Sequence, residues 1–297
     1  MAGQTMGGAA MSEANVLFDA PGPRARARHR ILTVIGALLA LAIAVLVIRT
    51  LASKGQFEAA KWKPFLTAEL WDAYLLPGLL GTLKAAALAI VISCILGPVL
   101  ALARMSGMRW LRAVATVWVE IFRAIPVLLM MIFFFGLYAY NAVFSAELNP
   151  LAATVTGLVL YNSAVLCEVL RSGVDQLPRG QREAGLSIGL SAGQTLRTIL
   201  LPQAITAMLP TLVSQLVVIL KDTALGYNIT YLELLNAGNT AASNYSNLVP
   251  MIFVVALIFI LINYSLTKLA EYLERRLKRR GHTAGSPTTD VAAAEPA

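Results

Sequence analysis

Six apolar runs, each of a length suited to crossing a membrane, constrain the fold of this chain more than any other feature of its sequence. The runs are Ile31–Leu51, Gly78–Ala103, Val114–Tyr140, Leu151–Leu170, Ala204–Leu220 and Leu248–Leu269. A helix of about 20 apolar residues spans the hydrocarbon core of a bilayer, because each residue adds about 1.5 Å along the helix axis. The sequence therefore predicts an all-α, polytopic membrane protein with about six transmembrane helices.

The composition excludes a soluble alternative. Hydrophobic residues make up 58% of the 297 residues and charged residues only 13%, against about 25% charged in typical soluble domains. A soluble chain of this length could not bury so much apolar surface, so lipid must solvate part of it. Pro126 lies inside the third run, and we expect the helix there to be kinked or to begin late.

The distribution of Lys and Arg predicts the orientation in the membrane. Sixteen of the 24 basic residues fall in four polar segments that share one face if the chain crosses at every run. They are Arg24, Arg26, Arg28, Arg30, Arg104, Arg109, Arg112, Arg171, Arg179, Arg182, Arg197, Arg275, Arg276, Lys278, Arg279 and Arg280. Basic residues favour the cytoplasmic side of spanning helices. Both termini, and the segment between the fourth and fifth runs, are therefore predicted to be cytoplasmic.

The same reading divides the chain into five parts. They are a disordered basic segment (1–30), an amino-terminal transmembrane helix (31–51), an extracytoplasmic amphipathic segment (52–77), a core of the remaining runs (78–280) and a disordered tail (281–297). Aromatic side chains in the third part are typical of a membrane interface. They are Trp62, Phe65, Trp71 and Tyr74.

Few residues are suited to catalysis or to metal binding. Cys94 and Cys167 lie inside apolar runs, where a free thiol acts as a small apolar group, and His29 and His282 lie in the polar tails. We find no H-E-x-x-H or G-x-x-x-x-G-K-[ST] motif. The basic residues are spread over loops, which argues against nucleic-acid binding. We expect no catalytic residue, no metal ligand and no nucleotide site in this chain.

One polar stretch interrupts the apolar pattern, at Gln181–Pro202, with the sequence QREAGLSIGLSAGQTLRTILLP. We expect a helix over Arg182–Ile188, ended by Gly189 in the left-handed conformation. Ser191 then caps a second helix over Ala192–Leu200, and Pro202 marks its exit.

The first helix of this stretch carries the residues that suit docking. Glu183 near its start is favoured by the helix dipole. Ala184 and Gly185 keep one side slim enough to enter a groove of a partner. Leu186 and Ile188 are apolar side chains that a lone polar loop would have no reason to expose.

The spacing of Glu183-Ala184-Gly185, Gly189 and Ile199-Leu200-Leu201-Pro202 resembles the coupling loop (E-A-A, three residues, G, nine residues, I-x-L-P) of permease subunits of bacterial ABC importers. This resemblance implies the type I, MetI-like permease fold, with a cytoplasmic coupling helix, in the bacterial cytoplasmic membrane. It also implies partners: two ATPase subunits that hold ATP and Mg, a second permease chain, identical or homologous, and an extracytoplasmic amino-acid-binding protein.

Three further segments narrow the resemblance to permeases for polar amino acids, closest to the actinobacterial glutamate uptake type. Ile121–Pro126 is similar to that subfamily's F-R-G-T-P stretch, Tyr161–Gln181 to its Y-x-A-E-x-x-R-x-G…P-x-G-Q stretch and Leu220–Leu225 to its L-K-D-T-S-L stretch. The resemblance covers about residues 78–280, so 31–51 is an added helix. Glutamate or aspartate is the implied solute. Three positions depart from the pattern, namely Gly185, Ser214 and Ala224.

Polar residues at membrane depth are the candidates for a substrate pathway, because such residues usually face a cavity or a partner. Lys221 and Asp222 end the fifth run, and a neighbouring cation and anion suit a zwitterionic amino acid. Gln215 and Ser214 lie a turn or two earlier, and Glu168 and Asn162 lie in the fourth run. Each has a structural alternative: pairing with other helices for Lys221 and Asp222, a local pair with Arg171 or Arg182 for Glu168, and packing between helices for Asn162.

Helix-breaking residues Gly226 and Asn228 would make the fifth span discontinuous, as at many transport sites. The favoured function is the permease subunit of an ATP-driven importer, which translocates a polar amino acid into the cytoplasm and is coupled through residues 183–202. The alternatives are a self-sufficient secondary transporter or channel and a membrane enzyme. A secondary transporter would need ion-coupling carboxylates at mid-membrane, where the runs have almost none.

Overall fold

A computed structural model describes residues 22–282, and every regular element within that range is a helix. The predicted all-α fold is therefore confirmed. Contacts between Cα atoms divide the chain into two compact units, Met1–Glu58 and Ala59–Ala297, which are described separately.

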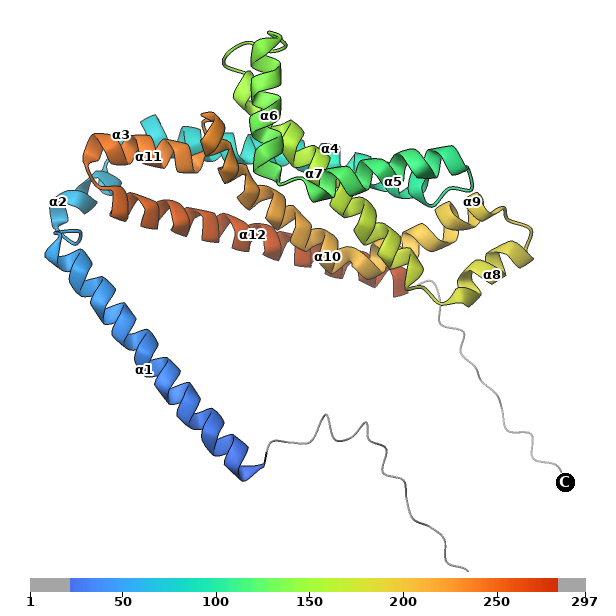
Figure 1. The fold of residues 1–297 in the computed structure, drawn as a ribbon, viewed down its shortest axis with the longest axis horizontal. Coiled ribbons are helices and arrows are strands. Elements are labelled where there is room, and N and C mark those ends of the chain that lie inside the picture. Colours follow the sequence, from blue (N-terminus) through green and yellow to red (C-terminus); the bar gives the residue numbers. More distant parts are fainter. Residues whose placement is uncertain (1–21, 283–297) are drawn as a thin grey trace, which may run out of the picture. The chain divides into compact units, whose positions relative to one another are not determined.

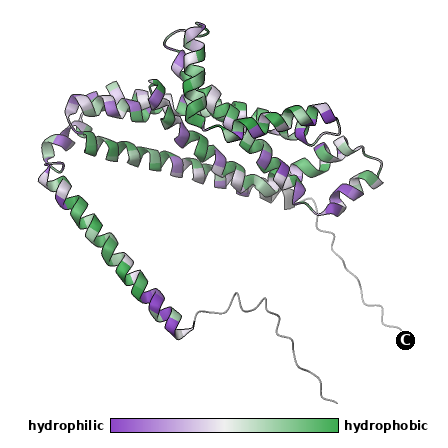
Figure 2. Cartoon of the chain, viewed as in Figure 1, coloured by the Kyte–Doolittle hydropathy of each residue, from purple (hydrophilic) through white to green (hydrophobic). Residues whose placement is uncertain are grey.

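The described part of the first unit contains one helix, α1 (Pro23–Ser53), which is apolar along most of its length (Figures 1 and 2). The predicted span Ile31–Leu51 lies inside it. The structure corrects the expected disorder of residues 23–30, which are helical, because proline is favoured in the first turn of a helix and arginine is a good helix former. Residues 1–21 of that predicted segment lie outside the described residues. Gly55, with φ of 63°, follows the helix end.

The second unit contains the remaining helices. They are α2 (Ala59–Trp62), η2 (Lys63–Leu66), α3 (Ala68–Leu70), η3 (Trp71–Leu75), α4 (Leu76–Arg104), α5 (Arg109–Ala124), α6 (Val127–Tyr140), α7 (Asn149–Asp175), α8 (Arg179–Ser187), α9 (Ala192–Thr195), η4 (Leu196–Leu200), α10 (Leu201–Asp222), η5 (Thr223–Ile229), α11 (Leu234–Tyr245) and α12 (Leu248–His282). Helix α7 is central, since α4, α5, α6 and α10 all pack against it (Figure 1). The start of the predicted disordered tail, at residues 281 and 282, is helical as well, and the rest of that tail lies outside the described range.

Five helical stretches of the described chain are long and apolar enough to cross a membrane, and they contain α1, α4, α7, α10 and α12. The third predicted span differs. It is divided into α5 and α6, whose axes are bent by 102°, so the total is six if the bent pair counts as one span. Proline disfavours a helical conformation in the preceding residue, and Ile125 is extended, with φ of −86° and ψ of 127°. Pro126 then starts α6, which projects from its neighbours (Figure 1).

Small side chains let α4 approach α7 closely. A Cβ atom added at Gly97 of α4 would lie 2.7 Å from Cβ of Leu166 on α7. Ala85, Ala89 and Ala101 are buried on the same helix. Small residues at helix interfaces are typical of membrane proteins, in which close packing replaces the hydrophobic effect between helices.

The aromatic segment after α1 packs onto the ends of two later helices. The indole N–H of Trp71 donates a hydrogen bond to the Phe65 carbonyl (2.9 Å), and Asn244 of α11 donates to the Tyr74 hydroxyl (2.6 Å). The rings of Trp62 and Phe253 of α12 lie 6.2 Å apart. These contacts attach residues 59–75 to the end of the unit that carries α11.

Candidate functional site

The predicted coupling loop folds as two short helices joined by a tight turn. The first, α8, covers Arg179–Ser187, three residues longer at its start than expected. Gly189 has φ of +86°, the left-handed conformation that was predicted, and its N–H donates to the Leu186 carbonyl (3.0 Å). Glycine is favoured here because it lacks the Cβ atom that makes this region costly for other residues.

Ser191 caps the second helix, as predicted. The Gln194 N–H donates to the Ser191 hydroxyl oxygen (3.3 Å), and the Ser191 N–H donates to the Gln194 side-chain oxygen (2.8 Å). This reciprocal arrangement is a capping box. It fixes the position at which the chain turns back toward the membrane.

The structure corrects the expected exit of the second helix at Pro202. The short helix α9 continues through the π-helical turn η4 into α10, and Pro202 lies in the first turn of α10. The Leu201 N–H bonds to the Leu196 carbonyl, five residues earlier. Proline is tolerated in a first turn, where its missing N–H costs little. The loop's second helix is therefore continuous with a spanning helix, so the two are expected to move together as one rigid element.

Gly185 closes the interior of the loop. It is buried, and an added Cβ atom would lie 2.5 Å from Thr195 Cγ2 and 3.1 Å from Ile199 Cδ1. The expectation that Gly185 faces a partner's groove was wrong, because the second helix of the loop already occupies that side. Ile199, also a motif residue, belongs to this internal contact.

The outer face of α8 is open. Glu183 and Ala184 are exposed, and Leu186 and Ile188 expose 45% and 75% of their surface. Exposed apolar side chains on an otherwise polar helix mark a surface that another protein can bury. The loop thus has a closed inner side and an apolar outer side.

Glu168 lies in a cluster of arginines at the end of α7. Its carboxylate is 2.7 Å from Arg104, 2.6 Å from Arg171 and 3.7 Å from Arg123, and Arg104 also pairs with Glu120 at 2.6 Å. Of the two structural partners considered for Glu168, the structure shows Arg171. These contacts connect α4, α5 and α7.

A cavity of about 470 Å³, in which four polar side chains stand among a mainly apolar lining, opens between α7, α10 and the bend that separates α5 from α6. Its lining residues are Arg123, Ala124, Ile125, Pro126, Val127, Leu128, Tyr161, Val165, Gln215, Val218, Asp222 and Leu225. The side chain of Gln215 donates to the Asn162 side-chain oxygen (2.7 Å), and Asn162 donates to the Leu158 carbonyl (2.7 Å). Gln215 is therefore held in place on the cavity wall.

The structure separates the other pathway candidates from this cavity. Lys221 is exposed and does not line it, and the Ser214 hydroxyl donates to the Pro210 carbonyl within its own helix (2.9 Å). Glu168 lies in the arginine cluster described above. The α-helix of the fifth span ends at Asp222, and Gly226 and Asn228 belong to the 3-10 turn η5.

Arg123 is the cavity residue that the sequence reasoning missed. The available signal was an ionisable residue inside an apolar run, three residues before Pro126. Arg123 from α5 and Asp222 from α10 both line the cavity, which therefore contains a cation and an anion, and the start of α6 adds the positive end of a helix dipole. Such an arrangement can hold both charges of a zwitterion.

A second missed residue is Glu233, a fully buried carboxylate that caps α11. It accepts hydrogen bonds from the N–H groups of Leu235 (2.8 Å) and Asn236 (2.6 Å). Burial raises the pKa of Glu233 from 4.5 to about 7, and the two backbone bonds limit the rise. Its signal was a capping residue just before a helix, since a carboxylate can accept the free amides there.

These features define the class of the protein: a multi-pass, all-helical membrane transport subunit with a coupling loop. The chain belongs to the family of binding-protein-dependent transport system inner membrane components, whose sequence model matches residues 89–279. It is thus the membrane permease of an ABC transporter.

Individual relatives agree with this assignment. The chain is 49% identical over 229 residues to the glutamate transport system permease protein GluD of Corynebacterium glutamicum, covering 77% of this chain and 84% of the relative. It is 30% identical over 208 residues to the glutamate/aspartate import permease protein GltK of Escherichia coli, covering 68% and 93%. The crystal structure of an amino acid ABC transporter matches with a TM-score of 0.64 at 27% identity, covering 71% of this chain and 98% of that one. The predicted permease fold and amino-acid permease family are confirmed.

Proposed function

We propose that this chain forms the membrane pathway of an importer that moves glutamate or aspartate into the cytoplasm and is driven by separate ATPase subunits. Two ATPase chains, with ATP and Mg, would bind at the coupling loop. A second permease chain and an extracytoplasmic binding protein would complete the transporter. Both termini and α8 would face the cytoplasm, in agreement with the distribution of basic residues.

The observation that carries the proposal is the geometry of the coupling loop. Its inner side is closed by Gly185, Thr195 and Ile199, while Leu186 and Ile188 remain exposed. The second helix continues into α10, so a force applied to the loop moves a helix that lines the cavity between α7, α10 and the α5–α6 bend. The likeness to glutamate permeases supports the choice of solute.

The test is uptake of radiolabelled glutamate into proteoliposomes that contain this chain, its permease partner and the ATPase. The binding protein is supplied outside and ATP inside, with unlabelled aspartate, glutamine and arginine as competitors. Glu183→Lys reverses a charge on the exposed face of α8, and we expect it to abolish ATP-dependent uptake. Glu147→Lys reverses an exposed charge between α6 and α7 and serves as the matched control.

Uptake that continues without ATP and is unaffected by Glu183→Lys would contradict the proposal and favour a secondary transporter. ATP hydrolysis without glutamate uptake would support coupling to the ATPase and would show that glutamate is not the transported solute. Equal losses in Glu183→Lys and Glu147→Lys would show that charge reversal acts by misfolding rather than at the loop.

We assign Arg123 and Asp222 to solute binding within the same proposal. A guanidinium binds carboxylates through paired hydrogen bonds, and a carboxylate binds the ammonium group. Replacing Arg123 by Gln should raise the KM for glutamate about tenfold or more, since a charged hydrogen bond contributes about 1.5–3 kcal/mol. Lys221→Gln, next to Asp222 but outside the cavity, is the control. A KM that changes equally in both variants would place the solute elsewhere.

A further inference from the structure

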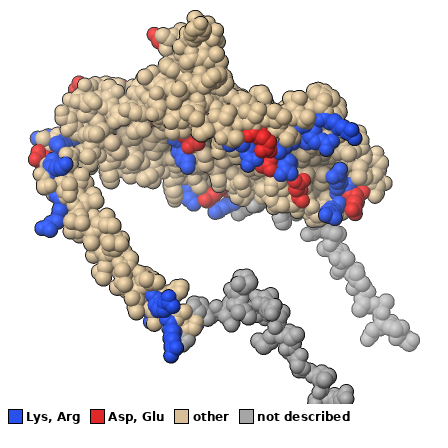
Figure 3. All heavy atoms as spheres, in the orientation of Figure 1, with Lys and Arg blue, Asp and Glu red and all other residues tan. Residues whose placement is uncertain are grey.

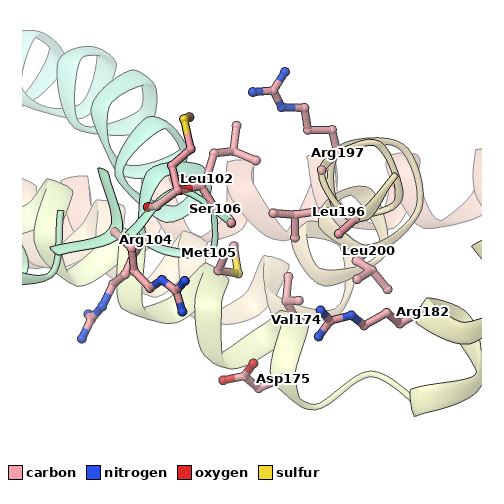
Figure 4. Close-up of a pocket in the computed structure, with 15 residues that line it drawn as sticks. Leu102, Arg104, Met105, Ser106, Val174, Asp175, Arg182, Leu196, Arg197 and Leu200 are labelled. Carbon is pink, nitrogen blue, oxygen red and sulfur yellow. The ribbon is translucent and has the colours of Figure 1, made fainter. Parts of the chain in front are cut away.

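A second cavity, of about 460 Å³, lies where the coupling loop meets the ends of α4 and α7 (Figure 4). Its walls come from the end of α4, the connection to α5 and the start of α5, together with the end of α7 and both helices of the coupling loop. Its polar lining is dominated by arginine. Figure 3 shows basic side chains gathered at the end of this unit that carries α8 and α9.

The charges around this cavity do not balance. Arg104 is neutralised by Glu168 and Glu120, and Asp175, an acidic lining residue, is already paired with Arg171 at 2.6 Å. The remaining arginines make no ion pair with any residue in the described part of the chain. They are Arg112 of α5, Arg182 of α8 and Arg197 of η4.

Most of the remaining lining is apolar. Leu102 and Met105 come from the end of α4, Val174 from α7, and Leu196 and Leu200 from η4. In Figure 4, Arg182 and Arg197 lie on opposite sides of Leu196 and Leu200. The cavity lining contains no aromatic side chain on which a nucleotide base could stack. A ligand with an anionic head and an apolar body fits this combination.

The position of the cavity points to the source of such a ligand. Two candidate membrane spans, Ala68–Arg104 and Asn149–Asp175, end at its wall. The cavity therefore lies at the depth where lipid headgroups meet the ends of spanning helices. Basic pockets between helices on the cytoplasmic side are suited to anionic headgroups, because that leaflet is negatively charged.

We infer that this cavity binds an anionic phospholipid, whose headgroup is attracted by the positive charge of Arg112, Arg182 and Arg197. The inference rests on the orientation given under the proposed function. Because the three arginines belong to α5, α8 and η4, a lipid bound among them contacts both the coupling loop and the rest of the bundle. The lipid then holds the coupling loop in the position seen in this structure.

The test is lipid binding by the purified full-length chain in detergent, followed by native mass spectrometry. Phosphatidylglycerol and phosphatidylcholine of equal acyl length are offered together, so that the headgroup charge is the only difference. The variant carries Arg112→Gln, Arg182→Gln and Arg197→Gln. The control carries Arg109→Gln and Arg179→Gln, which lie in α5 and α8 but do not line the cavity.

We expect wild type and control to prefer phosphatidylglycerol. The triple variant should lose affinity about fivefold for each arginine, or on the order of 100-fold in all. The preference should weaken with added salt, as expected for partly exposed charges. Unchanged phosphatidylglycerol binding in the triple variant would overturn the inference.

Two further arms separate the sources of the phosphate. In the first, millimolar inorganic phosphate displaces the lipid from the wild type but does not act on the triple variant. That result would support an anion site in the cavity and assign it to free phosphate instead of a lipid. If the chain alone binds no lipid, and the ATPase shields the cavity residues from solvent in lipid-free samples, the lipid would be rejected. The arginines would then be assigned to a contact with the ATPase. None of these measurements requires transport, so their outcome does not depend on the result of the uptake experiment.

Discussion

Replacing Glu168 by Gln removes a carboxylate shared by Arg104, Arg171 and Arg123, at 2.7, 2.6 and 3.7 Å. The amide is nearly the same size and still accepts a hydrogen bond, so the main change is the loss of negative charge. Glu120→Gln is a matched control, because Glu120 also pairs with Arg104 and at a similar distance, 2.6 Å.

The two glutamates differ in burial and in the number of arginines they pair with, and both differences set the expected cost. Removing one partner of a fully buried ion pair costs about 3–5 kcal/mol. The Glu168 side chain is 22% exposed, so solvent offsets part of this, and we expect about 2–3 kcal/mol for Glu168→Gln. The Glu120 side chain is 59% exposed, and Glu120→Gln should cost less than about 1 kcal/mol.

Cys167 provides a local assay, because it is buried and adjacent to Glu168. The exposed Cys94 is first replaced by Ala, so that alkylation by N-ethylmaleimide reports only opening around Cys167. Losses of 2–3 kcal/mol correspond to alkylation about 30- to 150-fold faster for Glu168→Gln. Glu120→Gln should change the rate by less than about fivefold. Equal rates in both variants would refute the argument that burial and the number of partners, rather than distance, set the strength of these pairs.

Three other predictions concern single side chains. Gly185→Ala places a methyl 2.5 Å from Thr195 Cγ2 and should speed amide exchange across the coupling loop roughly fivefold, since overpacking exceeds the gain in helix propensity. Adding Thr195→Ser should reverse this, and failure to do so would contradict the contact. Ser191→Ala removes the cap and should cost about 1 kcal/mol, seen as faster exchange in α9 but not in α8; exchange that rises equally in both would contradict the cap. Because burial raises the folded-state pKa of Glu233 from 4.5 to about 7, the folded state favours its neutral form. The stability that Glu233 contributes is fully present below pH 4.5 and is lost as the pH rises through 7, by up to roughly 3 kcal/mol. Glu233→Gln should flatten the dependence of the thermal midpoint on pH, and an unchanged slope would exclude Glu233 as its source.

The features that could be predicted from the sequence are local. The apolar runs predicted the spanning helices, because burying backbone groups in lipid requires a continuous helix of fixed length. Gly189 and Ser191 predicted a left-handed residue and a cap, because both depend on the chemistry of one or two neighbouring residues. Likewise, Pro126 predicted a break in the third span.

The angle of that break, 102°, could not be predicted, because it depends on how α6 packs against α7. The same holds for Gly185, which the motif placed on a partner's side and which the fold buries against Thr195. Pro202 was expected to end a helix, and the π-helical turn before it allows the helix to continue.

The composition of each polar site was decided only by the tertiary structure. Arg123 joins Asp222 in one cavity, although Lys221 is the cation next to it in sequence. Gln215 meets Asn162 across 53 residues, and Arg104 meets Glu168 across 64. Sequence determines which side chains lie at which depth of a helix, because helical rise is constant. Which of them meet depends on the rotation and crossing of packed helices, and these follow from side-chain contacts along their whole length.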